Sequence, residues 1–97
     1  MNKVILSKGS GDKKFKVKVD DKTVQFGLKG YSDFIKSGGN QTKKKAYIAR
    51  HRVNEDWSKS GMKSAGFWAK HLLWNKKSLN ESIKDTERRF NINIVRR

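Results

Sequence analysis

The chain has 97 residues, a length that fits one domain (residues 1–97) with a small hydrophobic core. It contains no cysteine, which excludes disulfides and thiolate metal sites, and it has no apolar run long enough for a transmembrane helix or a secretion signal. Its 24 lysine and arginine residues against nine acids give a net charge of +15, so we expect a polyanion such as nucleic acid as a partner.

The first thirty residues predict a three-stranded antiparallel meander. Val4–Leu6 is a short apolar run, residues 14–19 alternate between lysine and apolar side chains, and Val24–Phe26 resumes as a third strand. Strict alternation is the period of a half-buried strand, so the apolar members should face the core. The other face should carry a cationic row: Lys14, Lys16 and Lys18.

A basic helix is predicted from Thr42, as its N-terminal cap, to about Asn54. Its expected apolar stripe follows helical spacing: Ala46, Ala49, Val53 and Trp57. Much of its remaining surface is basic: Lys43, Lys44, Lys45, Arg50 and Arg52. Three lysines at a helix N-terminus oppose the positive end of the macrodipole, which favours an external anion at this place.

Residues 65–75 (AGFWAKHLLWN) contain two of the three tryptophans and predict a second helix, capped by Ser64. Apolar side chains surround most of it, so it should be buried in the core or docked against a partner. Because the chain has few other large apolar residues, we expect most of this block to be structural. Two aromatic side chains, Trp57 and Trp68, are retained as candidates for contact with a partner, for example by stacking on bases.

Ser78, with Glu81 three residues later, forms a capping box that predicts a third helix to about Phe90. Asp85 and Arg89 are spaced to form an ion pair on that helix. Asn91–Ile94 alternates like a strand and can pair with the meander. The predicted fold class is therefore α+β, with a small antiparallel N-terminal sheet that the C-terminal strand could join, packed by about three helices.

The sequence shows no catalytic constellation. His51 and His71 are the only histidines, and without cysteine a zinc site would need carboxylates as well. A small metal-dependent nuclease using these histidines is a remote alternative, because the acids form no recognisable metal cluster. We therefore expect no enzymatic activity, no metal and no cofactor.

The lysine rows have two interpretations. They can contact phosphate groups, because lysine binds phosphate as a point charge without reading sequence. They can equally be a solvated surface that protects a sheet edge. We favour the first interpretation, and the predicted nucleic-acid-binding residues are Lys14, Lys16, Lys18, Lys43, Lys44, Lys45, Arg50 and Arg52.

An ordered series of short motifs runs through the chain: Gly30-Tyr31-Ser32-Asp33-Phe34, Tyr47-Ile48-Ala49-Arg50-His51, Asn54-Glu55-Asp56-Trp57, Ala65-Gly66-Phe67-Trp68, Leu72-Leu73-Trp74-Asn75-Lys76, Ser82-Ile83-Lys84-Asp85 and Arg89-Phe90. Over most of residues 24–94 the chain resembles a group of short, basic proteins of unknown function encoded by large DNA viruses of algae and protists. It departs from them at Lys77, where a proline is usual, in the loop 37–40, which lacks their charges and proline, and at His71, where an aromatic residue is common.

The resemblance implies a viral source and carries no established activity, so no catalytic residue can be transferred. We therefore expect a non-enzymatic viral protein that binds nucleic acid with little sequence specificity. It should occur in the virion and in the host cytoplasm or nucleus, and it should not be secreted. The alternative is a minor capsid or cement protein that docks into a viral shell. The choice between DNA and RNA and the oligomeric state stay open.

Overall fold

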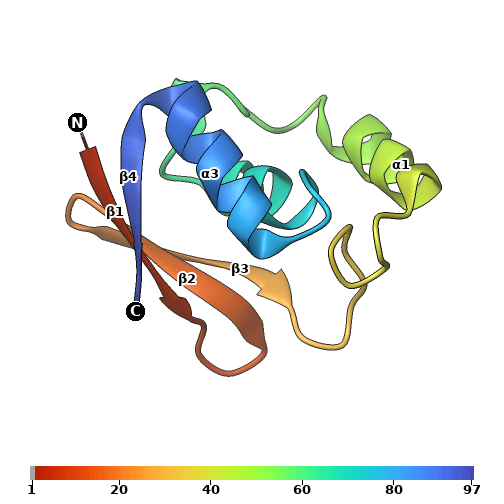
Figure 1. The fold of residues 1–97 in the computed structure, drawn as a ribbon, viewed down its shortest axis with the longest axis horizontal. Helices are drawn as coiled ribbons and strands as arrows, with labels where there is room; N and C mark the ends of the chain where they lie inside the picture. Colours follow the sequence, from red (N-terminus) through yellow and green to blue (C-terminus); the bar gives the residue numbers. More distant parts are fainter. Residues whose placement is uncertain (1) are drawn as a thin grey trace.

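A computed structural model describes residues 2–97. Its sheet contains β1 (Asn2–Lys8), β2 (Lys13–Val19), β3 (Lys22–Leu28) and β4 (Ile92–Arg96), in the order β3-β2-β1-β4. The first three strands form the predicted antiparallel meander, and β4 pairs with β1 in parallel (Figure 1). The α+β class and the joining of the C-terminal strand are thus confirmed, in a sheet that is mixed rather than purely antiparallel.

Five helical segments follow the meander and precede β4. They are α1 (Gln41–His51), the 3-10 helix η1 (Lys59–Gly61), α2 (Ala65–Trp68), the π-helix η2 (Ala69–Leu73) and α3 (Leu79–Phe90). Segments α2, η2 and α3 cover one face of the sheet, whereas α1 stands beyond it (Figure 1). No helix among residues 2–97 is long and apolar enough to cross a membrane.

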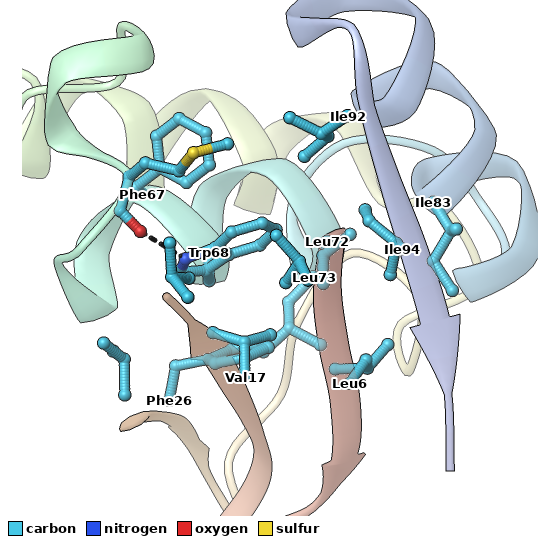
Figure 2. Packing of buried hydrophobic residues seen from close by; sticks show 14 residues of the cluster. Leu6, Val17, Phe26, Phe67, Trp68, Leu72, Leu73, Ile83, Ile92 and Ile94 are labelled. Atoms are coloured by element: carbon cyan, nitrogen blue, oxygen red, sulfur yellow. Dashed lines mark hydrogen bonds between the residues drawn. The ribbon is translucent and has the colours of Figure 1, made fainter. Parts of the chain in front are cut away.

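The core lies between the sheet and the aromatic block of residues 65–75. Alternate strand residues such as Val17 and Phe26 are buried beneath Trp68, as Figure 2 shows. The Trp68 side chain is 0% exposed, and its Nε1 donates a hydrogen bond to the Met62 carbonyl at 2.7 Å. The aromatic block is therefore structural, as expected. The prediction that Trp68 contacts a partner is wrong, because its side chain is not accessible to one.

The helix of the aromatic block changes to a π-helix at Ala69. The Trp74 amide donates to the Ala69 carbonyl at 3.2 Å, which closes a turn wider than an α-helical one. His71, Leu72 and Leu73 are all buried in this widened turn. Trp74 follows them, is half-buried against the edge of the core, and stacks on Tyr47 of α1.

Helix α3 follows its predicted design. The Ser78 hydroxyl accepts a hydrogen bond from the Glu81 amide at 3.1 Å, and Arg89 pairs with Asp85 at 3.2 Å. Asn91 ends the helix in the left-handed conformation (φ 54°), which turns the chain directly into β4. The strand consequently begins at Ile92, one residue later than the pattern predicts.

Helix α1 differs from its prediction in its cap and in its inner face. Asn40, not Thr42, caps the helix by accepting from the Lys43 amide at 3.1 Å, and the helix ends at His51. The predicted stripe is wrong. Its first members Ala46 and Ala49 are exposed, and Val53 is 77% exposed.

The side of α1 that faces the body follows a different set of helical positions: Lys44, Tyr47, Ile48 and His51. Tyr47 is the only buried residue of the helix. One large aromatic ring removes far more apolar surface from water than two alanine methyl groups, and this sets the orientation of the helix.

Candidate nucleic-acid interface

Lys16 and Lys18 lie on β2, on the sheet face that no described helix covers. Lys18 is exposed between Ile5 of β1 and Thr23 of β3, and Lys16 is half-buried between Ser7 and Gln25. These cross-strand neighbours carry no charge. The two ammonium groups therefore meet no carboxylate across the strands, and this face is open to an anion.

Lys14 does not belong to this open row. Its Nζ binds Asp33 Oδ2 at 2.5 Å and donates to the Tyr31 carbonyl at 2.7 Å. The Lys14 and Asp33 side chains are only 16% and 7% exposed. This ion pair holds the loop after β3 against the sheet, so Lys14 stabilises the fold and is not free for phosphate.

The predicted cations of α1 separate into two groups. Those exposed to solvent form no ion pair with any acid in residues 2–97: Lys43, Lys45, Arg50 and Arg52. Lys44 instead points inward, where its Nζ donates to the Asn75 carbonyl at 2.7 Å and lies 4.8 Å from the centre of the Phe34 ring. Burial lowers the pKa of Lys44, and the neighbouring Lys76 and Arg89 lower it further.

A second group of cations lies around the buried Asp85, and of its members the sequence pattern indicates only Lys44 and Arg89. The Asp85 carboxylate accepts from Asn75 at 2.8 Å, from Arg88 at 2.8 Å and from Arg89 at 3.2 Å. The Asn75 hydrogen bond is the main cause that lowers the pKa of Asp85. Burial lowers the pKa of Lys70, and the nearby Arg89 adds to this shift.

One carboxylate thus lies among cations from α1, η2, the segment after η2 and α3: Lys44, Lys70, Lys76, Arg88 and Arg89. The cluster keeps an excess of positive charge at the surface. Helical spacing accounts for Arg88 and Arg89 beside Asp85, but Lys44, Lys70 and Lys76 join them only through the fold.

Trp57 is half-buried beside this cluster. Its ring lies 5.6 Å from Lys70 Nζ and 6.4 Å from the Tyr47 ring, and its Nε1 is buried with no hydrogen-bond partner within residues 2–97. The contacts on both sides leave only part of the ring accessible. The prediction that Trp57 contacts a partner stays untested, and most of its contacts lie within the protein.

A pocket of about 380 Å³ lies between the end of β3, helix α1 and the start of the aromatic block. Tyr47 and Trp74 form its aromatic wall, with ring centres 4.6 Å apart and planes inclined by 9°. The His51 ring stacks on the other side of Tyr47 at 4.2 Å. Burial, together with the charge of Glu55, raises the pKa of Tyr47 to about 12.

Two glycines allow the walls of this pocket to approach closely. A Cβ atom at Gly66 would lie 1.5 Å from Glu55 Oε2, so only glycine lets the Glu55 carboxylate rest on the start of α2. Gly27 has φ +74°, and a Cβ there would lie 2.8 Å from Leu73 Cδ1. Two of the predicted nucleic-acid-binding residues, Lys14 of β2 and Arg50 of α1, both line this pocket.

The two histidines lie in different environments. His51 lines the pocket, and its Nδ1 donates to the Tyr47 carbonyl at 2.9 Å. The His71 ring is 2% exposed between Phe67 and Phe90, and its Nε2 donates to the Trp57 carbonyl at 2.9 Å. Burial lowers the pKa of His71 to about 4, so it is neutral at pH 7 and out of reach of a substrate.

Residues 2–97 contain no group of three or more histidine, aspartate and glutamate side chains placed to hold a metal ion. A metal site built from His51, His71 and nearby acids is therefore not assembled in the part of the chain that the structure describes.

Comparison with known proteins gives one match. The model of a family of unknown function (DUF5754) matches residues 4–51, which run from β1 to the end of α1. No curated protein and no solved structure matches the chain. The matched segment contains both the sheet meander and the basic helix, and it carries no activity that could be transferred.

Proposed function

We propose that the protein binds nucleic acid without catalysis, through phosphate contacts and with little sequence specificity. The observation that carries this proposal is the solvent face of α1, where Lys43, Lys45 and Arg50 are exposed and form no ion pair within the described residues. Cations without internal partners, concentrated on one helix, provide the electrostatic footprint of a phosphate-binding surface.

The polarity of α1 supports an external anion. Its first turn contains no acid, and its lysines begin within that turn at Lys43, where the backbone amides already supply partial positive charge. This arrangement costs the isolated protein stability. A phosphate group near the N-terminal turn would remove the repulsion and gain from the dipole at the same time.

The open sheet face offers a second set of contacts through Lys16 and Lys18. Lysine ammonium groups on flexible stems bind phosphate oxygens but do not match the donor and acceptor pattern of a base edge. We therefore expect similar affinities for unrelated sequences and a strong dependence on salt.

Fluorescence anisotropy with a labelled DNA of random sequence tests this proposal across about 50 to 200 mM salt, where several phosphate contacts together cost orders of magnitude in affinity. The double variant Lys43→Gln, Lys45→Gln should reduce the slope of log affinity against log salt by about two. The matched control Lys59→Gln, Lys84→Gln removes the same charge from exposed positions outside α1 and should change the slope little. Binding that is insensitive to salt, or equal losses in both variants, would falsify the proposed interface.

The resemblance to short basic proteins of large DNA viruses supports a further part of the proposal, that the nucleic acid is a viral genome and the protein a component of the virion. Mass spectrometry of purified particles, separated into shell and genome fractions, tests it. We expect the protein with the genome. Recovery in the shell alone would favour a cement protein, and absence from the particle would exclude both virion roles.

A further inference from the structure

We propose that the pocket between β3, α1 and the start of the aromatic block receives one unstacked base of a single-stranded nucleic acid. This inference rests on the proposed function and adds to it a preferred form of the ligand. Phosphate contacts on α1 hold a strand of any structure, whereas the pocket would select a strand whose bases are free to leave the stack.

The size and lining of the pocket fit a nucleobase. Its volume of about 380 Å³ lies within the range of small-molecule sites, which are typically apolar with a few polar groups. The apolar lining comes from Leu73, Ala69 and Gly66 and from the Tyr47–Trp74 wall. The stacking of Tyr47 between His51 and Trp74 fixes this wall before any ligand arrives.

The rim of the pocket is unusually apolar for so charged a chain. Leu28, Tyr31 and Val53 are the large apolar side chains that stay exposed in residues 2–97, and the first two line the pocket. Tyr31 is 68% exposed and follows the end of β3. An exposed aromatic ring beside a pocket is a suitable stacking platform for a base that enters it or for the next base along the strand.

Charge and hydrogen-bonding groups in the pocket discriminate between possible ligands. The Glu55 carboxylate lies against Gly66 inside the pocket and would repel a free phosphate group. It can instead accept hydrogen bonds from the amino and imino groups of a base edge. Arg50 and Lys13 also line the pocket and are placed for the phosphates that flank the inserted base.

A duplex cannot use this pocket without paying for the removal of a base from the stack, whereas a single strand presents its bases freely. The structure therefore predicts that single strands bind more tightly than duplexes of the same phosphate number.

The decisive experiment compares two single strands of equal length and charge, one with bases and one fully abasic, by fluorescence anisotropy at fixed salt. We expect the strand with bases to bind on the order of tenfold more tightly, as for one stacked base. Ala65→Leu, at an exposed position in the pocket lining, should fill the pocket and remove this preference while leaving affinity for the abasic strand unchanged. Tyr31→Ala should reduce the preference several-fold.

Val53→Ala is the matched control, because Val53 is an exposed apolar residue just after α1 that does not line the pocket. It should keep the full preference. Circular dichroism and thermal unfolding should be the same in all three variants and the parent protein. Equal binding of both strands, or a preference that survives Ala65→Leu and Tyr31→Ala, overturns the pocket inference and leaves phosphate binding intact. If neither strand binds, both proposals are overturned.

Discussion

Helices α1 (QTKKKAYIARH) and α3 (LNESIKDTERRF) are similar in length but use charge in opposite ways, because no acid balances the lysines and arginine of α1, whereas α3 holds equal numbers of acids and cations. In α3, Glu81 lies in the first turn and Arg88 and Arg89 in the last, as the helix dipole favours. In α1 the first turn contains no acid and begins a lysine triplet. The charges of α3 thus stabilise the protein itself, whereas the exposed lysines of α1 form no ion pair within the described residues, which is the feature that the proposed external anion would satisfy.

The two helices also differ in attachment. Four residues of α3 are buried, among them Ile83 in the core, whereas α1 buries Tyr47 alone. We conclude that α3 belongs to the cooperative unit that sets global stability. Helix α1 is held to the rest of the protein by the stacking of Tyr47 on Trp74 and Trp57 and by the contacts of Lys44 with Asn75 and Phe34, so it is the more loosely attached of the two helices.

The most damaging change on the α3 side should be Trp68→Ala. It removes a fully buried indole between the sheet and the helices, together with its hydrogen bond to the Met62 carbonyl. We expect a loss of about 3–5 kcal/mol in the free energy of unfolding, enough to unfold a domain of this size in part. Urea unfolding followed by circular dichroism measures it. A loss below about 1 kcal/mol would contradict the placement of Trp68 in the core.

Acid should weaken the same unit through His71. Its pKa falls from 6.5 to about 4 on folding, so the stability that neutral His71 contributes is fully present above pH 6.5 and is lost as the pH falls towards 4. The loss should approach about 3 kcal/mol. His71→Phe, which keeps a ring between Phe67 and Phe90, should flatten this part of the pH profile in urea unfolding. A profile identical to that of the parent protein would count against a buried neutral imidazole.

Tyr47→Ala should lower the local stability of α1 without affecting that of α3. Removal of the ring breaks the stack with Trp74, so α1 should detach and lose amide protection in hydrogen exchange. Because the core does not contain Tyr47, we expect less than about 2 kcal/mol of global destabilisation. Ile83→Ala is the control, since it lies in α3 and should lower protection throughout the sheet. Global unfolding by Tyr47→Ala would show that α1 is part of the core unit.

The smallest expected effects come from the two helix caps. Asn40→Ala and Ser78→Ala each remove one side-chain hydrogen bond to a first-turn amide, worth about 1 kcal/mol. Ser78→Ala should reduce global stability by that amount, whereas Asn40→Ala should only fray α1. Hydrogen exchange resolved by residue distinguishes the two. Equal effects on global stability would remove the distinction between the helices.

Much of the fold could be predicted because its signals are local. Strict alternation in residues 14–19 defines β2, and the Ser78–Glu81 capping box defines the start of α3. The inner face of α1 could not be predicted in this way, because Tyr47 stacks on Trp74, which follows the π-turn of η2 and lies at the edge of the core. A regular α-helical period places this tryptophan with the other residues of the aromatic block.

The candidate site was harder to predict because charge alone does not show which cations are free. Lys14 and Lys44 match the pattern of the other lysines, but Asp33 binds the first and the Asn75 carbonyl binds the second. The pocket escaped prediction for a related reason. Its lining comes from the end of β3, from α1 and from the aromatic block, and each contributes residues that are ordinary in their local context.

The parallel pairing of β1 with β4 has a consequence for the order of folding. Val4 pairs with Ile94, so the sheet joins segments from opposite parts of the described chain. The meander and α3 can form from local contacts early, but the edge of β1 that faces away from β2 stays unpaired until β4 has been synthesised. Contacts so distant in sequence slow folding. During synthesis, the nascent chain would already contain the basic helix α1 while the sheet still lacked β4.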